Sequence, residues 1–445
     1  MSGPRLLQGA RVLDPAQRLD AVMDLLVVDG AIARLAPAIP APENAEVIDL
    51  SGLCLSPGFV DVHVHLREPG GEHKETIESG ASAAVAGGFT SVCAMPNTDP
   101  PIDDPAAVGF VLAKGERARL ARVYPVGAVS VGLEGKEMTE IGELIAAGAV
   151  AVSDDGHPVW DSGLMRRALE YTQVFDIPVF SHAEDQGLSG QGVMNEGAVS
   201  TALGLRGIPN ASEDVAVARD CLIAELTGGR LHICHVSTAG SAEIIRAAKA
   251  RGVRVTAEVT PHHLALTDEA VRGYRTDAKM SPPLRSASDV AAVRDALVEG
   301  VIDCIATDHA PHHYEEKERE FDDAAFGVVG LETALGVSLQ EMVLGGRLDL
   351  LELVDRMASK PAQIAGLPAG SLADGANADI VVFDPEERWE CRADRFCSRG
   401  RNTPFKGREL VGRVVMTLVG GRTVYDRRGE RADARATVKV SEDVG

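Results

Sequence analysis

Four histidines and two aspartates of this sequence stand where their side chains could bind metal ions. The sharpest pattern is His63 and His65, because residues two apart on a β-strand project to the same side. His182, His235 and Asp308 follow further along the chain, each at the end of a short apolar run. Imidazole and carboxylate ligands without thiolate suit zinc, manganese, cobalt or nickel. The set therefore predicts a metal site rather than incidental histidines on an exposed strand.

The number of candidate ligands points to two metals. Four histidines and two aspartates exceed one tetrahedral site and suffice for two metals that share a bridging carboxylate and a hydroxide. The fourth apolar run would have to supply the bridge, and residues 144–158 contain no lysine that could be carboxylated for that purpose. Asp155 is the natural candidate. Its neighbour Asp154 would point to the opposite face, because adjacent strand residues alternate.

Such a constellation predicts hydrolysis of an amide-like bond. A bound metal polarises a carbonyl group. Asp308, a carboxylate at one metal, could take a proton from the hydroxide and later give it to a leaving nitrogen.

Arg67 follows the histidine pair closely and could bind a substrate carboxylate. A guanidinium meets a carboxylate with a rigid two-pronged set of donors. The alternative is a loop arginine that pairs with Glu68 or Glu72. The residue types alone leave both interpretations open.

The remaining histidines have weaker claims on the chemistry. His232 lies three residues before His235, so alternation places it on the other face, and we interpret it as structural. His262 and His263 end the seventh run and either support the site or pack there. His312 lies just past the eighth run, where a role in substrate binding and a packing role are both open.

The elements that position these residues alternate regularly between short apolar strands and Ala-rich amphipathic helices. We expect strands at 58–65, 90–96, 122–130, 149–155, 177–184, 231–238, 253–261 and 303–311. We expect helices between them around 74–87, 103–119, 161–175, 213–228, 240–251 and 286–299. Strands this apolar favour a parallel sheet buried on both faces, and eight such units fit an α/β fold of the (β/α)8 TIM-barrel type. The alternative is an open doubly wound sheet, although no GxGxxG follows an early strand.

Both ends of the chain have a different texture, with β-branched runs and hairpin turns. Asp29-Gly30 and Gly420-Gly421 are turn signals between such runs. We expect the two ends to pair into one small β-sandwich domain. The predicted division is 1–55 for its N-terminal part, 56–368 for the barrel, 369–426 for its C-terminal part and 427–445 for a charged tail.

Composition excludes several classes of protein. The 445 residues carry 44 basic and 66 acidic side chains, a formal net charge of −22, which argues against nucleic acid as a partner. No apolar run reaches the roughly 18 residues that span a membrane, and the N-terminus lacks the pattern of a secretion signal. The seven cysteines are scattered without a CxxC pair and are typical of a reduced, cytoplasmic protein.

The motifs together resemble the amidohydrolase superfamily and, within it, the dihydroorotases. The resemblance covers about residues 5–425. Its motifs are PGFVDVHVHLREPG, MPNTDPP, SDDGHPV, HVSTAGS, ATDHAPH and AFGVVGLETA. It implies reversible closure of N-carbamoyl-L-aspartate to L-dihydroorotate plus water, in pyrimidine biosynthesis, with Asp308 as the proton shuttle.

The resemblance also implies a set of site residues. Two zinc ions per chain would be bridged by Asp155 and hydroxide. The implied ligands are His63, His65, Asp155 and Asp308 for one ion and Asp155, His182 and His235 for the other. The implied substrate contacts are His65, Arg67, Asn97, Ser281, His312, Phe326 and Gly327.

One position departs from the family pattern. The family often has Asn before Pro-Pro-Leu-Arg, whereas this chain has Ser281, as its hydantoinase and dihydropyrimidinase relatives do. The competing interpretations are therefore a hydantoinase-, dihydropyrimidinase- or allantoinase-type cyclic amidase, and a non-catalytic subunit that scaffolds aspartate carbamoyltransferase. By analogy we expect a homodimer, with association with that transferase as a further option.

Overall fold

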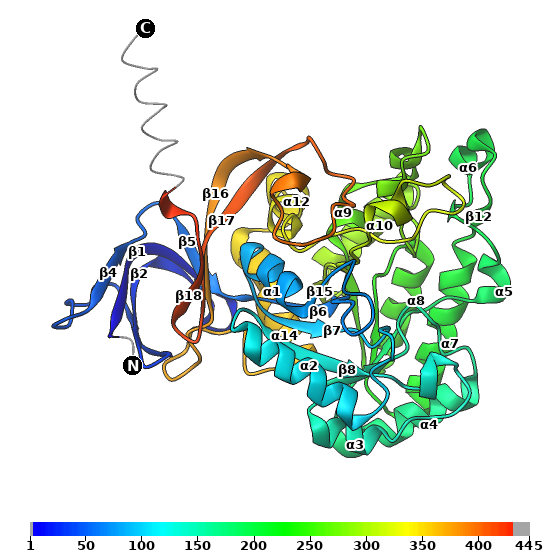
Figure 1. The fold of residues 1–445 in the computed structure, drawn as a ribbon, viewed down its shortest axis with the longest axis horizontal. Coiled ribbons are helices and arrows are strands. Elements are labelled where there is room, and N and C mark those ends of the chain that lie inside the picture. The colour runs from blue at the N-terminus through cyan, green and yellow to red at the C-terminus, as the bar shows by residue number, and fades with distance from the viewer. Residues whose placement is uncertain (1–2, 430–445) are drawn as a thin grey trace, which may run out of the picture.

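The computed structural model describes residues 3–429 and shows two joined bodies (Figure 1). A barrel wrapped by helices occupies the right of the view. The blue N-terminal strands and the red C-terminal strands form a β domain at its left. Of the predicted charged tail, residues 430–445 lie outside the described part of the chain.

Eight parallel strands follow one another around the barrel in sequence order. They are β6 (Phe59–Val64), β7 (Phe89–Ala94), β8 (Arg122–Gly127), β9 (Ala151–Ser153), β10 (Val179–Ser181), β13 (Leu231–Ile233), β14 (Val255–Val259) and β15 (Cys304–Ile305). The first strand meets the segment after the last one through a bridge between Val64 and His309, with a 2.9 Å hydrogen bond from the His65 N–H to the His309 carbonyl. The unreversed order and this contact confirm the predicted barrel and exclude the doubly wound sheet.

Several barrel strands end sooner than expected. We expected strands over 231–238 and 303–311, whereas β13 and β15 cover only the beginnings of those runs. His235 and Asp308 have φ angles of 35° and 46°. Side chains with a Cβ seldom adopt such left-handed backbone, and it breaks the extended geometry of a strand. The strands therefore stop where the candidate ligands begin.

Most of the longer helices begin at side-chain caps that follow the loops after the strands. Thr76, Asp104, Asp161, Thr238 and Ser286 each accept a backbone N–H of the first helical turn, which satisfies a donor that the helix cannot. The longer helices are α1 (Ile77–Ala86), α2 (Pro105–Ala118), α4 (Ser162–Thr172), α7 (Ala211–Thr227), α8 (Ala239–Ala250) and α10 (Ala287–Val298). The shorter ones are α3 (Ile141–Ala147), α5 (Gln186–Ser189), α6 (Ala198–Leu203), α9 (Pro261–Ala265), α11 (Tyr314–Lys317), α12 (Ala334–Ser338), α13 (Leu350–Val354) and α14 (Lys360–Ala365). Within residues 3–429, none of these helices combines the length and the apolar character that a membrane crossing requires.

The β domain joins the two chain ends in one mixed sheet, as predicted. Its strands are β1 (Arg5–Asp14), β2 (Leu19–Val28), β3 (Ala31–Ala36), β4 (Glu46–Asp49), β5 (Cys54–Pro57), β16 (Ile380–Glu390), β17 (Glu409–Val419) and β18 (Arg422–Asp426). The ends meet where β5 pairs antiparallel with β16. At both predicted hairpins the turn residues have positive φ, 49° and 82° at Asp29-Gly30 and 54° and 70° at Gly420-Gly421, as the primed turns of hairpins require. A separate two-stranded sheet, β11 (Met194–Asn195) with β12 (Gly207–Ile208), belongs to neither of these two large sheets.

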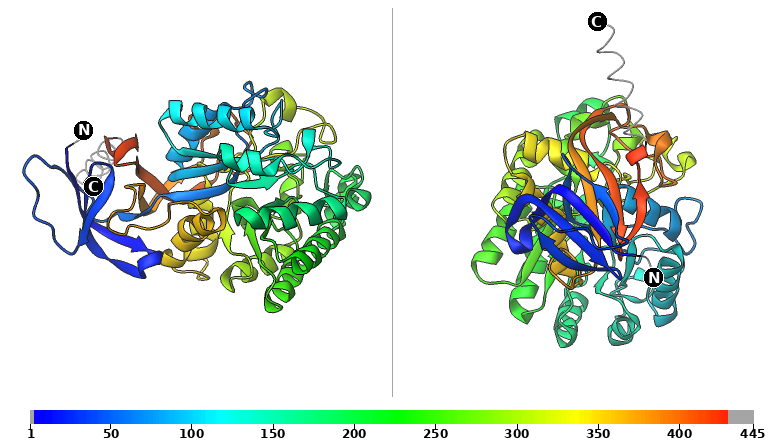
Figure 2. Two further views of the ribbon diagram at one scale, coloured as in Figure 1. Left: turned by 90° about the horizontal axis from the view of Figure 1, so that it is seen from below. Right: turned by 90° about the vertical axis from the view of Figure 1, so that its left-hand side faces the viewer.

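The β domain packs directly against the barrel (Figure 2). Phe59 of the barrel contacts Phe89 and, across the interface, Phe383 of β16, with ring centroids 5.7 and 6.2 Å apart. A half-buried ion pair adds to this contact, because the Arg122 guanidinium lies 2.7 Å from the Asp379 carboxylate. Cys54 and Val381 of the β domain also pack with the barrel core, while the β domain has a separate hydrophobic core of its own.

Candidate active site

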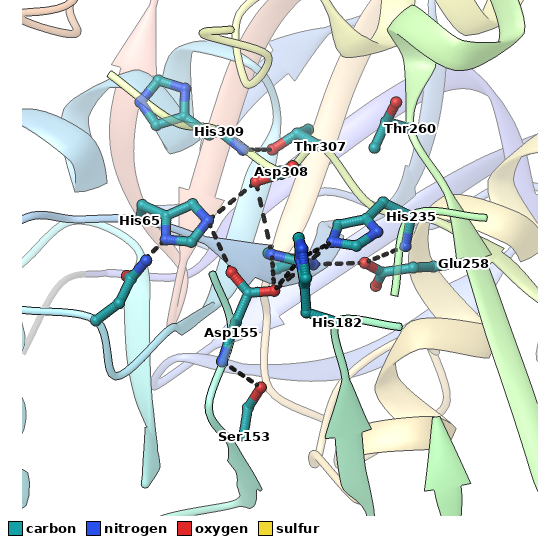
Figure 3. A network of polar contacts seen from close by, with 12 residues as sticks. His65, Ser153, Asp155, His182, His235, Glu258, Thr260, Thr307, Asp308 and His309 are labelled. Atoms are coloured by element: carbon teal, nitrogen blue, oxygen red, sulfur yellow. Dashed lines mark hydrogen bonds and ion pairs between the residues drawn. The ribbon is translucent and has the colours of Figure 1, made fainter. Parts of the chain in front are cut away.

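The six predicted ligand side chains converge at the end of the barrel where its strands finish, and Figure 3 labels all of them except His63. Asp155 lies at their centre. Its Oδ1 is 3.4 Å from His63 Nε2, 3.5 Å from His182 Nδ1 and 3.6 Å from His235 Nε2, and its Oδ2 is 3.3 Å from His65 Nε2. The two oxygens of one carboxylate thus face different histidines, which is the arrangement that a bridging ligand needs.

Asp308 lies on the opposite side of the histidine pair from Asp155. Its Oδ1 is 3.0 Å from His65 Nε2 and 3.5 Å from His63 Nε2. All six side chains are buried, and His63 is completely so. The left-handed backbone of Asp308 and His235 persists only because the surrounding structure holds it, and such positions cluster at functional sites.

Three of the histidines are oriented by a partner on the ring nitrogen that faces away from the cluster. His63 Nδ1 is 2.6 Å from Glu258 Oε1, His65 Nδ1 is 2.8 Å from Asn97 Oδ1, and His182 Nε2 is 3.3 Å from Glu184 Oε2. An acceptor on one ring nitrogen places the proton there and leaves the lone pair of the other nitrogen directed at the cluster.

The electrostatics of the cluster reflect its crowded charges. Burial opposes the charged form of His63, but Asp155, Glu258 and Asp308 outweigh it and raise the pKa of His63 well above its ordinary value. Burial also opposes ionisation of Asp155 and Asp308, yet the neighbouring histidines lower the pKa of both carboxyl groups. The cluster thus keeps its carboxylates ionised within a buried pocket.

The geometry fits a metal centre. His63 Nε2 and Asp155 Oδ1 are buried and form no hydrogen bond with any described residue. The potential ligand atoms of His63, Asp155 and His235 all lie within 4.8 Å of one another. The same is true of the potential ligand atoms of His63, His65 and Asp308. Buried polar atoms without a partner are costly, and a cation among these imidazole and carboxylate donors would satisfy them.

A cavity of about 370 Å³ opens above this cluster. Every residue of the predicted ligand and substrate set lines it, apart from His63, which lies beneath. Those lining residues are His65, Arg67, Asn97, Asp155, His182, His235, Ser281, Asp308, His312, Phe326 and Gly327. The Gly-rich stretch 186–192 contributes Gln186, Ser189, Gly190 and Gly192 to the rim.

Arg67 lines this cavity, half-buried, and has no carboxylate within ion-pair distance among the described residues. Its Nε donates to the Pro311 carbonyl at 3.2 Å, and its Nη2 lies 3.4 Å from His312 Nε2. The alternative pairing with Glu68 or Glu72 is wrong, because Glu68 instead accepts the Ile77 N–H and pairs with Lys114. The guanidinium is therefore held in place without a direct ion pair, although Asp308, Glu316 and Asp155 lie near enough to act on its charge.

The structure also shows residues that the sequence analysis missed. Glu258 is fully buried on β14, carries a pKa lowered to about 2 by the charge of His63 against the effect of burial, and joins His63 to His232. His232, which alternation assigned to the opposite face, thus shares a carboxylate with His63 from below the site. Asp154 does point away, as expected, and accepts the Val129 N–H at 2.8 Å.

The sequence comparisons agree with this geometry. The family described as Dihydro-orotase-like matches residues 52–241, and the Amidohydrolase family matches residues 215–425. Dihydroorotases of Pelobacter propionicus and Geobacter metallireducens are each 55% identical over 422 residues, 95% of this chain and 99% of theirs. One from Anaeromyxobacter dehalogenans is 56% identical over 428 residues, 96% of this chain and 99% of its own.

Solved structures share the whole fold. An L-hydantoinase (dihydropyrimidinase) from Arthrobacter aurescens superposes with a TM-score of 0.85 at 28% identity, over 96% of both chains. A dihydropyrimidinase from Brevibacillus agri gives 0.84 at 23% identity over 95% of both chains, a likeness of fold. Barrel, cluster and neighbours define a metal-dependent hydrolase with the amidohydrolase fold. Among these hydrolases, the extent and identity of the sequence matches show that the chain belongs to the dihydroorotase family.

Proposed function

We propose that the protein interconverts N-carbamoyl-L-aspartate and L-dihydroorotate, the latter a six-membered cyclic imide with a carboxylate on the ring. The observation that carries this proposal is Arg67, a half-buried guanidinium in the cavity wall that forms no ion pair with a carboxylate of the described residues. A charge withdrawn from water is costly unless it is paired, and the substrate carboxylate would pair it. His312 and Asn97, which line the same cavity, are the proposed additional donors to that carboxylate.

We propose two zinc ions as the metals. His63, His65 and Asp308 would hold one ion, His182 and His235 the other, and Asp155 would bridge them. The separate directions of the two Asp155 oxygens and the unsatisfied His63 Nε2 support this assignment. Bound metals of this kind polarise a carbonyl and lower the pKa of water.

The residues of the chain then divide the remaining work. Asp308 would take a proton from the attacking water and pass it to the ring nitrogen as the amide C–N bond breaks. The same atoms would run in reverse for ring closure, in which the ureido nitrogen loses its proton and water leaves. Asp308 Oδ1 lies 3.0 Å from His65 Nε2, close to the other proposed metal ligands.

Ser281, Phe326 and Gly327 line the cavity and are the proposed contacts to the substrate ring. The hydantoinase-like alternative has two supports, the Ser281 motif and the likeness to solved hydantoinases. Against it stand Arg67, which a ring without a carboxylate would leave unpaired, and relatives of at least 55% identity that are dihydroorotases. The scaffold alternative has no support from the cluster, because none of the six proposed ligand side chains is missing from it.

The metal proposal is tested by titration. Protein stripped by a chelator is reloaded with increasing zinc, and bound zinc per chain and hydrolysis of L-dihydroorotate are measured together. We expect activity to reach its plateau at two zinc ions per chain. A plateau at one ion, with a second ion that binds without effect or not at all, would overturn the binuclear proposal.

A further inference from the structure

Asn402 makes an unusually complete set of contacts between the β domain and the cavity. It lies in the segment between β16 and β17, and only 3% of its surface is exposed. Its Nδ2 donates to the carbonyls of Ala310 and Gly327, each at 3.0 Å, and its Oδ1 accepts the His312 N–H at 3.1 Å. Two donors and one acceptor of a single amide are thus engaged with backbone groups of the barrel.

Those backbone groups belong to the two segments that form one wall of the cavity. Ala310 and His312 lie on either side of Pro311, and the Pro311 carbonyl accepts from Arg67 Nε at 3.2 Å. Asn402 therefore forms hydrogen bonds with the residues on both sides of Pro311, whose carbonyl accepts from the Arg67 guanidinium. Its own carbonyl accepts the Val329 N–H at 3.0 Å, which fixes Asn402 in turn.

The second segment is packed too tightly against the first for either to move alone. A Cβ on Gly327 would lie 2.7 Å from the Ala310 carbonyl oxygen and 2.9 Å from His312 Nε2. Gly327 also has a φ of 148°, where side chains are disfavoured. A displacement of Gly327 would therefore be transmitted to the His312 ring.

We propose that Asn402 is a positioning residue for recognition of the substrate carboxylate. It sets the distance of His312 from Arg67 and the orientation of the Arg67 guanidinium without touching the substrate itself. The C-terminal part of the β domain thus completes the specificity site of the barrel. The inference rests on the proposed function, in which Arg67 and His312 bind that carboxylate.

The amide is matched to this task in a way that close substitutes are not. The substitution Asn402→Asp would keep an acceptor for the His312 N–H but would turn an oxygen toward the carbonyls of Ala310 and Gly327. Alanine would leave all three backbone groups without this partner, and unsatisfied buried groups shift to find new ones. Errors of about 1 Å in the placement of binding groups cost up to about a hundredfold in rate.

The test measures kcat and KM for L-dihydroorotate in zinc-loaded wild type, Asn402→Asp and Asn402→Ala. We expect KM to rise about tenfold or more, with kcat within about threefold of wild type. The matched control is Thr403→Val, a fully buried neighbour whose hydroxyl accepts only the Phe405 N–H among the described residues. That variant should keep the wild-type KM.

A double-mutant cycle with His312→Ala separates positioning from general damage to the fold. If Asn402 acts through His312, Asn402→Ala should lower kcat/KM by less than about twofold once His312 is already alanine. An equal loss in both backgrounds, or a loss in kcat at constant KM, would overturn the proposal. If Asn402→Ala does not fold, Asn402→Ser takes its place in the cycle. A wild type that does not turn over L-dihydroorotate refutes the proposed function instead, and this shows before any variant is made.

Discussion

Glu258 is predicted to control metal affinity from beneath the site, although it is not itself one of the proposed ligands. Its carboxylate is fully buried, 2.6 Å from His63 Nδ1 and 3.1 Å from His232 Nε2. Glu258→Gln keeps the shape and can keep the His63 hydrogen bond through its amide oxygen, while its amide nitrogen would donate to His232 Nε2. At His63 the substitution therefore removes the charge and keeps the hydrogen bond. A hydrogen bond to a charged group contributes about 1.5–3 kcal/mol and a neutral one about 0.5–1.5 kcal/mol. The difference, about 1–1.5 kcal/mol, corresponds to a loss of roughly tenfold in affinity.

Glu258→Ala removes the hydrogen bond as well and should reach the upper end of the roughly 10–100-fold loss typical of such partners. The assay is competition for zinc between the protein and a chelator of known affinity, at fixed pH, for both variants. The control is Asp154→Asn, next to a proposed ligand but facing Val129 and Ser130, which should lose stability and keep its zinc affinity. Zinc affinity in Glu258→Ala equal to that of wild type would refute the reasoning.

Three further predictions concern individual residues. Arg67→Met should weaken transition-state binding of the carboxylated substrate by about 2–5 kcal/mol, through KM, because it removes the charged partner of the carboxylate; an unchanged KM for L-dihydroorotate would exclude the carboxylate clamp. Asp308→Ala should lower kcat by a factor of about 10²–10⁴ or more while the thermal unfolding temperature stays close to wild type; normal turnover would exclude the proton shuttle. Burial raises the pKa of Glu332 to about 7, against the backbone N–H groups of Cys397 and Ser398. The folded state therefore binds the proton of the Glu332 carboxyl group more tightly than the unfolded state does. The contribution of this group to folding stability is complete below about pH 4.5 and is lost as the pH rises through about 7. Glu332→Gln should be about 1–2 kcal/mol more stable than wild type at about pH 8 but not at about pH 4.5, which unfolding curves at the two pH values check; a constant difference would contradict the assignment.

The barrel and most of the cluster could be predicted because their signals are local. His63 and His65 show their common direction within three residues, and His182, His235 and Asp308 each end an apolar run of their own. Asp155 stands out because the surrounding stretch has no lysine. The hairpins at Asp29-Gly30 and Gly420-Gly421 are likewise predicted from pairs of adjacent residues, and the structure confirms them.

The supporting residues could not be predicted, because their partners are far away in sequence. Glu258 lies 195 positions from His63, and Asn402 lies 90 positions from His312. Nothing in their own surroundings marks them, since Glu258 stands in a short strand without another charged residue and Asn402 in a loop rich in polar residues. Strand alternation predicted that His232 faces away from the site, but its ring contacts the same Glu258 carboxylate as His63. The closed barrel and the length of the Glu258 side chain determine this contact.

The most direct test of the central claim is a side-by-side hydrolysis assay of the zinc-loaded protein with L-dihydroorotate and 5,6-dihydrouracil. The two rings differ in the carboxylate that Arg67 is proposed to bind. We predict a kcat/KM at least about a hundredfold higher for L-dihydroorotate, which corresponds to about 2.8 kcal/mol of discrimination. Equal or better turnover of 5,6-dihydrouracil would contradict the account and would assign the cavity to a ring without a carboxylate.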